Sequence, residues 1–179
     1  MTGLARSHLV HLLMLLVGAV HLSGCSPFYI GAVAPTPTVS LARSRLTLAL
    51  VIGPHVADEV PESDHIGAVQ LPVKKFHISV RNGFIFCFQP YYRLVSTNAD
   101  LTLHIEALRI EIGGGHGELV VHYAARLDRR DGTTVGRSFG ALTPPHRIGA
   151  GWRLALSEAL ARFYEKLAAD LFVRRSVSP

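Results

Sequence analysis

The most regular pattern of hydrophobic and polar positions lies near the C-terminus of the chain. Apolar residues recur there every three or four positions, at Trp152, Leu156, Leu160, Phe163, Leu167 and Leu171. This spacing places them on one face of an α-helix and leaves most charged side chains of the segment on the other faces. The pattern predicts one amphipathic helix over residues 151–173, about six turns long, that packs on a core through its apolar stripe.

In the segment before the helix, apolar residues occupy every second position. Leu101, Leu103 and Ile105 alternate with other residues, and a second apolar set over 108–112 alternates on the opposite parity. A one-residue β-bulge near Ala107 would restore both sets to one face of a sheet. The apolar row at 119, 121, 123, 125 and 127 predicts the next strand, connected to the first through the glycine-rich residues 113–117.

Turn residues follow the second strand of this meander. The sequence Arg-Asp-Gly at 130–132 suits a three-residue hairpin loop with Gly132 in the left-handed conformation. A third strand is expected over 135–141, until Pro144 and Pro145 end it.

The region ahead of the meander is less regular. Alternating leucines predict a strand over 46–52, which Gly53 and Pro54 close. A second extended segment is expected over 67–78, although Pro72 places it at an edge or introduces a break.

Residues 79–89 fit two different structures. Asn82 and Gly83 lie between two alternating runs, which favours a hairpin. Alternatively, Ser79 could cap a short helix that presents Val80, Phe84 and Phe88 on one face. The residues alone leave both structures open. In either case the fold class expected is α+β, with two layers. A mainly antiparallel sheet of about four or five strands carries the long C-terminal helix on one face, and in the helical alternative one short helix packs on the same face.

The N-terminal residues have the composition of a secretion leader. Arg6 supplies a positive charge, and the apolar run over 9–22 is shorter than a membrane-spanning helix requires. The formal net charge of the chain is +5, and loss of Arg6 with the leader lowers it to +4. A mild excess of this size is typical of a solubility feature, and it also suits anionic envelope surfaces.

The leader ends in Leu22-Ser23-Gly24-Cys25, which resembles the lipobox of bacterial lipoproteins. This resemblance implies a signal peptide over residues 1–24, cleavage between Gly24 and Cys25, and diacylglycerol and acyl chains on Cys25. These chains would hold the mature protein on a membrane. In such lipoproteins a serine after the cysteine permits transfer to the outer membrane. Ser26 therefore implies the periplasmic side of the outer membrane, with the inner membrane as the alternative.

Composition divides the mature chain into three parts. Residues 25–44, which include Ala34-Pro35-Thr36-Pro37-Thr38, predict an extended, flexible tether that does not pack into a core. Residues 45–173 are expected to form a single α+β domain of sufficient length for a core of its own. Residues 174–179 are expected to be a disordered tail.

The residues that could carry chemistry do not form a recognisable catalytic pattern. His104, Glu106 and His122 lie on the outward parity of adjacent strands, where a metal could bind, but the expected register places His104 opposite Arg126. The glycines over 113–117 join two strands and do not feed a helix, so the mechanism of a phosphate loop is absent. We expect no enzyme, no cofactor and no metal.

Cys87 lies within an aromatic stretch that contains Phe84, Phe86 and Phe88 and continues into Tyr91, Tyr92 and Arg93. Because Cys25 would be acylated, Cys87 has no disulfide partner, and a small buried apolar role is expected. If the stretch is helical, Phe84 and Phe88 enter the core. Phe86, Tyr91, Tyr92 and Arg93 are then the candidates for a partner surface.

The succession of elements resembles small α+β envelope lipoproteins of the YajG type and, more distantly, PelC, LpoB and the amino-terminal region of CsgG. The matching features are the tether, the strand at 46–52, the segment Asn98-Ala99-Asp100-Leu101-Thr102-Leu103, the hairpin around Asp131-Gly132 and the terminal helix. The resemblance covers residues 45–172 and implies a helix at 79–89. It also implies a noncatalytic accessory or assembly protein, whose partner is an envelope protein or a second copy of the chain, and not nucleic acid. A module that binds envelope lipid, glycan or peptidoglycan is the alternative, and a metal-dependent hydrolase is the third hypothesis.

Overall fold

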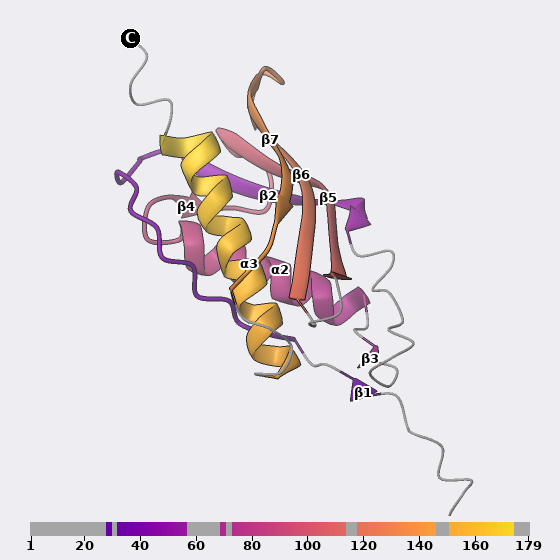
Figure 1. Ribbon diagram of the computed structural model, residues 1–179. Coiled ribbons are helices and arrows are strands. Elements are labelled where there is room, and N and C mark those ends of the chain that lie inside the picture. The colour runs from indigo at the N-terminus through magenta and orange to yellow at the C-terminus, as the bar shows by residue number, and fades with distance from the viewer. Residues whose placement is uncertain are drawn as a thin grey trace, which may run out of the picture.

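A five-stranded mixed sheet forms one layer of the molecule, and two helices form the other (Figure 1). The computed structural model describes residues 28–29, 32–56, 69–70, 73–113, 118–145 and 151–173. The elements are β1 (Phe28–Tyr29), β2 (Thr47–Val56), β3 (Val69–Gln70), α2 (Val73–Phe88), β4 (Arg93–Leu94), β5 (Leu101–Gly113), β6 (Glu118–Arg129), β7 (Thr134–Leu142), α3 (Trp152–Ala168) and the π-helical turn η2 (Ala169–Val173). The predicted fold class is confirmed.

The strand order of the main sheet is β4-β2-β5-β6-β7. Strand β2 is parallel to both β4 and β5, whereas β5, β6 and β7 form an antiparallel meander. Parallel neighbours need a crossover connection, and α2 lies in the connection from β2 to β5. A separate pair, β1 with β3, is also parallel.

The meander agrees with the predicted register. The pairing of β5 with β6 shifts between Ile105 and Ala107, so Glu106 is the extra residue of the expected bulge. The bulge returns both apolar sets of β5 to the helix side, and Leu103, Ile105, Leu108 and Ile110 are all buried. In the hairpin loop, Gly132 has a φ of 83°, the left-handed conformation that the sequence predicted.

Helix α3 covers the sheet with the predicted stripe. Leu156, Leu160, Phe163, Leu167 and Leu171 are buried, the last of them in η2. The hydroxyl of Ser138 on β7 donates a 2.7 Å hydrogen bond to Asp170, which ties the end of this helical segment to the sheet.

Helix α2 resolves the ambiguous segment in favour of a helix and extends further toward the N-terminus than expected. The extended segment predicted over 67–78 is wrong beyond β3, because residues 73–78 are helical. Burial explains the outcome: the face formed by Phe76, Val80, Phe84, Cys87 and Phe88 is enclosed between the sheet and α3. Tertiary packing thus outweighs the local turn preference of Asn82-Gly83.

Strand β2 is longer than predicted. Gly53 and Pro54 do not close it, because the strand continues to Val56 through a register shift between Ile52 and His55. Gly53 is required at this point, since a Cβ would lie 2.9 Å from the main-chain oxygen of Ile105.

Residues 32–44, here called the strap, run in an extended conformation along the two helices and do not form a free tether (Figure 1). Val33 is a member of the core, and Pro35 is buried. The expectation that residues 25–44 remain outside the folded unit is therefore wrong for this part. Cys25 and Ser26 lie outside the described residues, as does the predicted tail at 174–179.

Candidate functional surfaces

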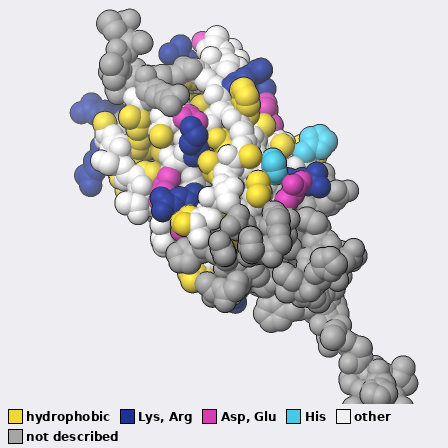
Figure 2. All heavy atoms as spheres, in the orientation of Figure 1, with side chains coloured by type: hydrophobic (Ala, Val, Ile, Leu, Met, Phe, Trp, Pro, Cys, Tyr) yellow, Lys and Arg dark blue, Asp and Glu magenta, His cyan; other side chains and the backbone are white. Residues whose placement is uncertain are grey.

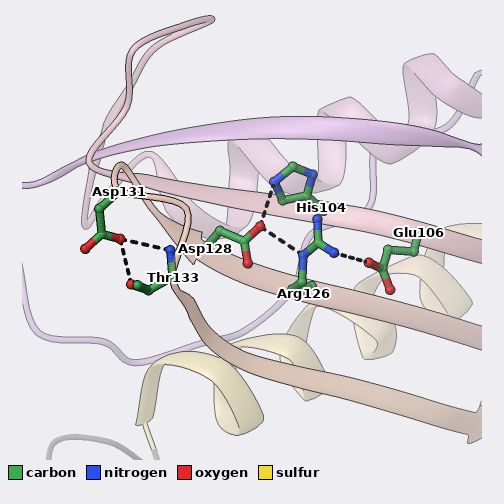
Figure 3. Close-up of polar contacts among 6 residues, drawn as sticks. All are labelled: His104, Glu106, Arg126, Asp128, Asp131 and Thr133. Carbon is green, nitrogen blue, oxygen red and sulfur yellow. Dashed lines mark hydrogen bonds and ion pairs between the residues drawn. The ribbon is translucent and has the colours of Figure 1, made fainter.

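The face of the sheet turned away from the helices carries linked charged side chains on β5 and β6 (Figure 3). Arg126 is central: its Nε lies 2.9 Å from Asp128 Oδ2, and its Nη1 lies 3.0 Å from Glu106 Oε1. His104 Nε2 lies 3.3 Å from the same oxygen of Asp128. The outward parity of both strands brings these residues together, and the bulge places Glu106 within reach of the guanidinium.

This ion-pair network links strands β5 and β6. Arg126 balances two carboxylates at once, and Asp128 is only 13% exposed, so solvent weakens their attraction less than at an open surface. Oδ1 of Asp128 is buried and has no hydrogen-bond partner in the part of the chain that the structure describes. The Arg126–Glu106 and His104–Asp128 contacts both cross between β6 and β5, so the network has a structural role in holding these two strands together.

The three residues considered as metal ligands are not brought together. His104 contacts Asp128, Glu106 contacts Arg126, and His122 Nε2 lies 3.2 Å from Glu111 Oε2. The predicted register, with His104 opposite Arg126, is confirmed. Within the described ranges, no group of three His, Cys, Asp or Glu side chains is placed to hold a metal ion.

A hollow of about 400 Å³ lies beside the two bulges on the same side of the sheet. Small residues, including Ala107, Ala124 and Gly140, line it together with His55, Arg109, His122 and Tyr123. Arg109 and His122 both contact Glu111, at 3.1 and 3.2 Å. Figure 2 shows histidine, acidic and basic side chains gathered at the right-hand side of the view. Sequence reasoning missed this hollow because it depends on neighbouring bulges in two strands.

The aromatic stretch divides between the core and the surface, as the helical alternative predicted. Phe84 and Phe88 are buried, with ring centroids 5.4 Å apart, whereas Phe86 is 53% exposed. Ile85 is also exposed and lines a shallow groove of about 310 Å³ between α2 and the β4 edge, with Arg81 at the same groove.

Two of the four predicted partner-surface residues have structural contacts. The hydroxyl of Tyr91 donates a 2.6 Å hydrogen bond to the main-chain oxygen of Val39. Tyr92 stacks edge-on against Phe88 and Phe172, and burial raises the pKa of its hydroxyl. Phe86 and Arg93 are exposed, the latter on the short edge strand β4.

The strap follows α3 with a regular spacing. The main-chain oxygens of Ala32 and Ala34 accept hydrogen bonds of 3.4 Å from Arg153 and Ser157, and the main-chain nitrogen of Thr38 donates one of 2.9 Å to Glu165. Two strap residues thus correspond to four helix residues, and four strap residues to eight. The rise of a polyproline-type chain, about 3.1 Å per residue, is twice that of an α-helix, about 1.5 Å, so the two remain in step.

On its other side the strap is held by α2 and the turn that follows. Val33 donates its main-chain N–H to Ser79 Oγ at 2.9 Å, and its oxygen accepts from Asn82 at 3.3 Å. Gly83 leaves the space that the Pro35 ring and the Tyr164 ring occupy. Val33, Ser79 and Tyr91 were missed as docking residues, because the proline-rich composition of the strap is equally typical of a free linker.

Cys87 is buried within the helix layer, and its thiol contacts the main-chain oxygen of Tyr164 at 3.9 Å. Burial, with a smaller contribution from the nearby charge of Glu165, raises the pKa of the thiol to about 12. At neutral pH the thiol is protonated and enclosed, as expected for an apolar core residue and not for a nucleophile.

Comparison with known proteins supports the fold. No family model matches the chain, and no curated protein matches its sequence. Among solved structures, protein XCC0632 from Xanthomonas campestris, assigned to the family DUF330, superposes with a TM-score of 0.52 at 16% identity. That alignment covers 79% of this chain and 91% of the other. An identity this low establishes a similar fold and nothing further.

Two other solved structures are similar at lower scores. A PelC dodecamer from Paraburkholderia phytofirmans gives a TM-score of 0.41 at 21% identity, over 74% of this chain and 92% of that chain. A protein of unknown function gives 0.41 at 13% identity, over 86% of this chain and 99% of that chain.

In the described ranges of the present chain, no helix is long and apolar enough to span a membrane.

Proposed function

We propose that this protein is a lipid-anchored, noncatalytic accessory or assembly protein of the bacterial cell envelope. The anchor would be diacylglycerol on Cys25, after cleavage at Gly24. Ser26 favours the periplasmic side of the outer membrane, with the inner membrane as the alternative.

The observation that carries this proposal is the docking of the strap. A lipid anchor would fix the position of the domain only if the segment that follows the anchor is itself held by the domain. Val33 is buried in the core and bonded through both main-chain groups to α2. With lipid on Cys25, the docked strap would fix the position of the domain relative to the membrane, which would suit a protein whose role is to place a surface.

The surface offered to an envelope partner would lie on the outer side of α2. Phe86 and Ile85 expose apolar area there, and the adjacent groove could take up a side chain of the partner. A photo-crosslinking amino acid at position 86 in intact cells should give one discrete adduct, while the same amino acid at exposed Thr97 should not. Absence of an adduct at 86, together with a monomeric protein that retains no envelope component, would contradict the accessory role.

The alternative function, a module that binds an envelope ligand, is favoured by the hollow beside the bulges. Its small floor and the Arg109 and His122 side chains would suit an anionic group on a glycan or lipid. Retention on anionic envelope polymers that is lost in Arg109→Ala and kept in Arg137→Ala would support it. If both variants are retained equally, or if neither the unaltered protein nor the variants are retained, the ligand-binding function is contradicted.

A further inference from the structure

The docked strap shortens the connection between the anchor and the domain. Cys25 lies seven residues before Ala32, and seven residues span at most about 24 Å. A free spacer over all of residues 25–44 would instead reach about 65 Å at full extension. Ala32 itself is fixed beside Arg153, at the end of the domain where α3 begins.

This short connection restricts which part of the domain can face the bilayer. Helix α3 and η2 together extend from Trp152 to Val173, a length of about 30 Å. The strap enters at the start of this length and proceeds toward its end (Figure 1). Because the chain reaches the anchor through Ala32, the end that carries Arg153 lies closer to the anchor than the end that carries Val173.

The near end also has exposed apolar side chains. Leu154, in the first turn of α3, is 51% exposed. Ile78 is 46% exposed and immediately precedes Ser79, whose hydroxyl accepts the Val33 hydrogen bond. Both side chains thus lie close to the point at which the chain arrives from the anchor.

The charge at this end is unusual for helix N-termini. Acidic residues are normally favoured in a first turn because the helix dipole is positive there. Helix α3 has none in its first turn and has Arg153 there instead. The positive end of the α3 dipole and the Arg153 side chain complement the phosphates of lipid headgroups.

We propose that the domain rests on the bilayer with the end at which α3 begins. Arg153 lies among anionic headgroups, and Ile78 and Leu154 lie at the boundary of the acyl chains. This inference rests on the proposed lipid anchor. In this arrangement the strap holds the domain against the membrane in one orientation, whereas the flexible tether predicted from the sequence would leave the domain free to move away from the membrane.

Full-length acylated protein in vesicles of phosphatidylethanolamine and phosphatidylglycerol provides the test. A fluorophore would be placed on Leu154→Cys or, as the matched control, on Val173→Cys at the far end; buried Cys87 does not compete for the label. Brominated acyl chains should quench the probe at 154 at least about fivefold more than the probe at 173, because interfacial apolar groups lie within about 10 Å of the acyl boundary. Equal quenching at the two positions, or stronger quenching at 173, would overturn the orientation.

A second variant tests the role of the short connection without disturbing the core. An insertion of about 20 Gly and Ser residues between Ser26 and Pro27 adds about 25 Å of average reach and leaves the strap unchanged. Quenching at 154 should then fall while the protein stays on the vesicles, and unchanged quenching would contradict the dependence on linker length. Intact mass separates this result from failure of the anchor: unacylated protein refutes the proposed function, whereas acylated protein without position-dependent quenching refutes only the orientation.

Discussion

The main-chain nitrogen of Val33 donates a 2.9 Å hydrogen bond to the hydroxyl of Ser79, 46 residues further along the chain. Asn82 donates to the oxygen of Val33 from the next turn of the same helix. A residue in a proline-rich segment is thereby held through both main-chain groups while its side chain enters the core. The strap is consequently part of the folded unit, and its release should lower the free energy of unfolding.

Replacing Val33 by aspartate should release the strap. Burial of a valine side chain contributes about 1.5–3 kcal/mol, and an unpaired carboxylate cannot take its place in the core. We expect the free energy of unfolding to fall by about 2 kcal/mol in denaturant titrations. Thr36→Asp, at an exposed position of the same segment, should leave it nearly unchanged. Equal stability of the two variants would show that the strap does not support the fold.

Gly83→Ala tests the packing between α2, α3 and the strap. Alanine has the better helix propensity by about 1 kcal/mol, so a free helix would gain stability. Here the added Cβ would overlap the ring of Tyr164 and lie 2.8 Å from Pro35 Cγ. We expect a net loss of about 1–3 kcal/mol by overpacking, measured by thermal unfolding. A stabilised variant would indicate that the strap and Tyr164 yield easily.

Asp100 should give the protein an acid-dependent component of stability. Hydrogen bonds from the main chain and side chain of Thr47, followed by the charges of Arg130 and Arg93, lower the pKa of Asp100. Because the folded pKa lies below the unfolded value, this stabilisation is present above about pH 4 and is lost as the pH falls through the folded pKa. Asp100→Asn should therefore flatten the decline of stability below pH 4. An unchanged acid profile would argue against the carboxylate contact.

Much of the sheet and the long helix could be predicted, because their signals are local. The change of parity between Ile105 and Leu108 encodes the bulge, and Gly132 encodes the loop conformation, each within a few residues. The helical state of residues 73–78 was missed since it depends on a buried face shared with α3. The docking of the strap was missed for the same reason: Val33 and Pro35 read as linker until their contacts with Ser79, Gly83 and Tyr164 are known.

The candidate surfaces were predictable to a smaller extent. The exposure of Phe86 follows from helix geometry, but the inward roles of Tyr91 and Tyr92 depend on Val39 and Phe172, which are distant in sequence. Prediction of the hollow beside Ala107 and Ala124 would have required the second bulge, at Gly53, where a strand end was expected.

Cys87 provides a probe of global opening. Its thiol is buried and its pKa is raised to about 12, so a maleimide at pH 7 should not react with the folded protein. Denaturant should expose it, and the rate of labelling should then follow unfolding. Rapid labelling of the native protein would show that the α2–α3 packing opens locally.

We propose that lipid at Cys25 fixes the folded domain to a membrane. Mass spectrometry of the N-terminal peptide from membrane-bound protein tests it most directly. We predict a peptide that begins at Cys25 and carries the mass of diacylglycerol, which is absent from Cys25→Ser. A peptide that retains residues before Cys25, or an unmodified N-terminus at another position, would contradict the account.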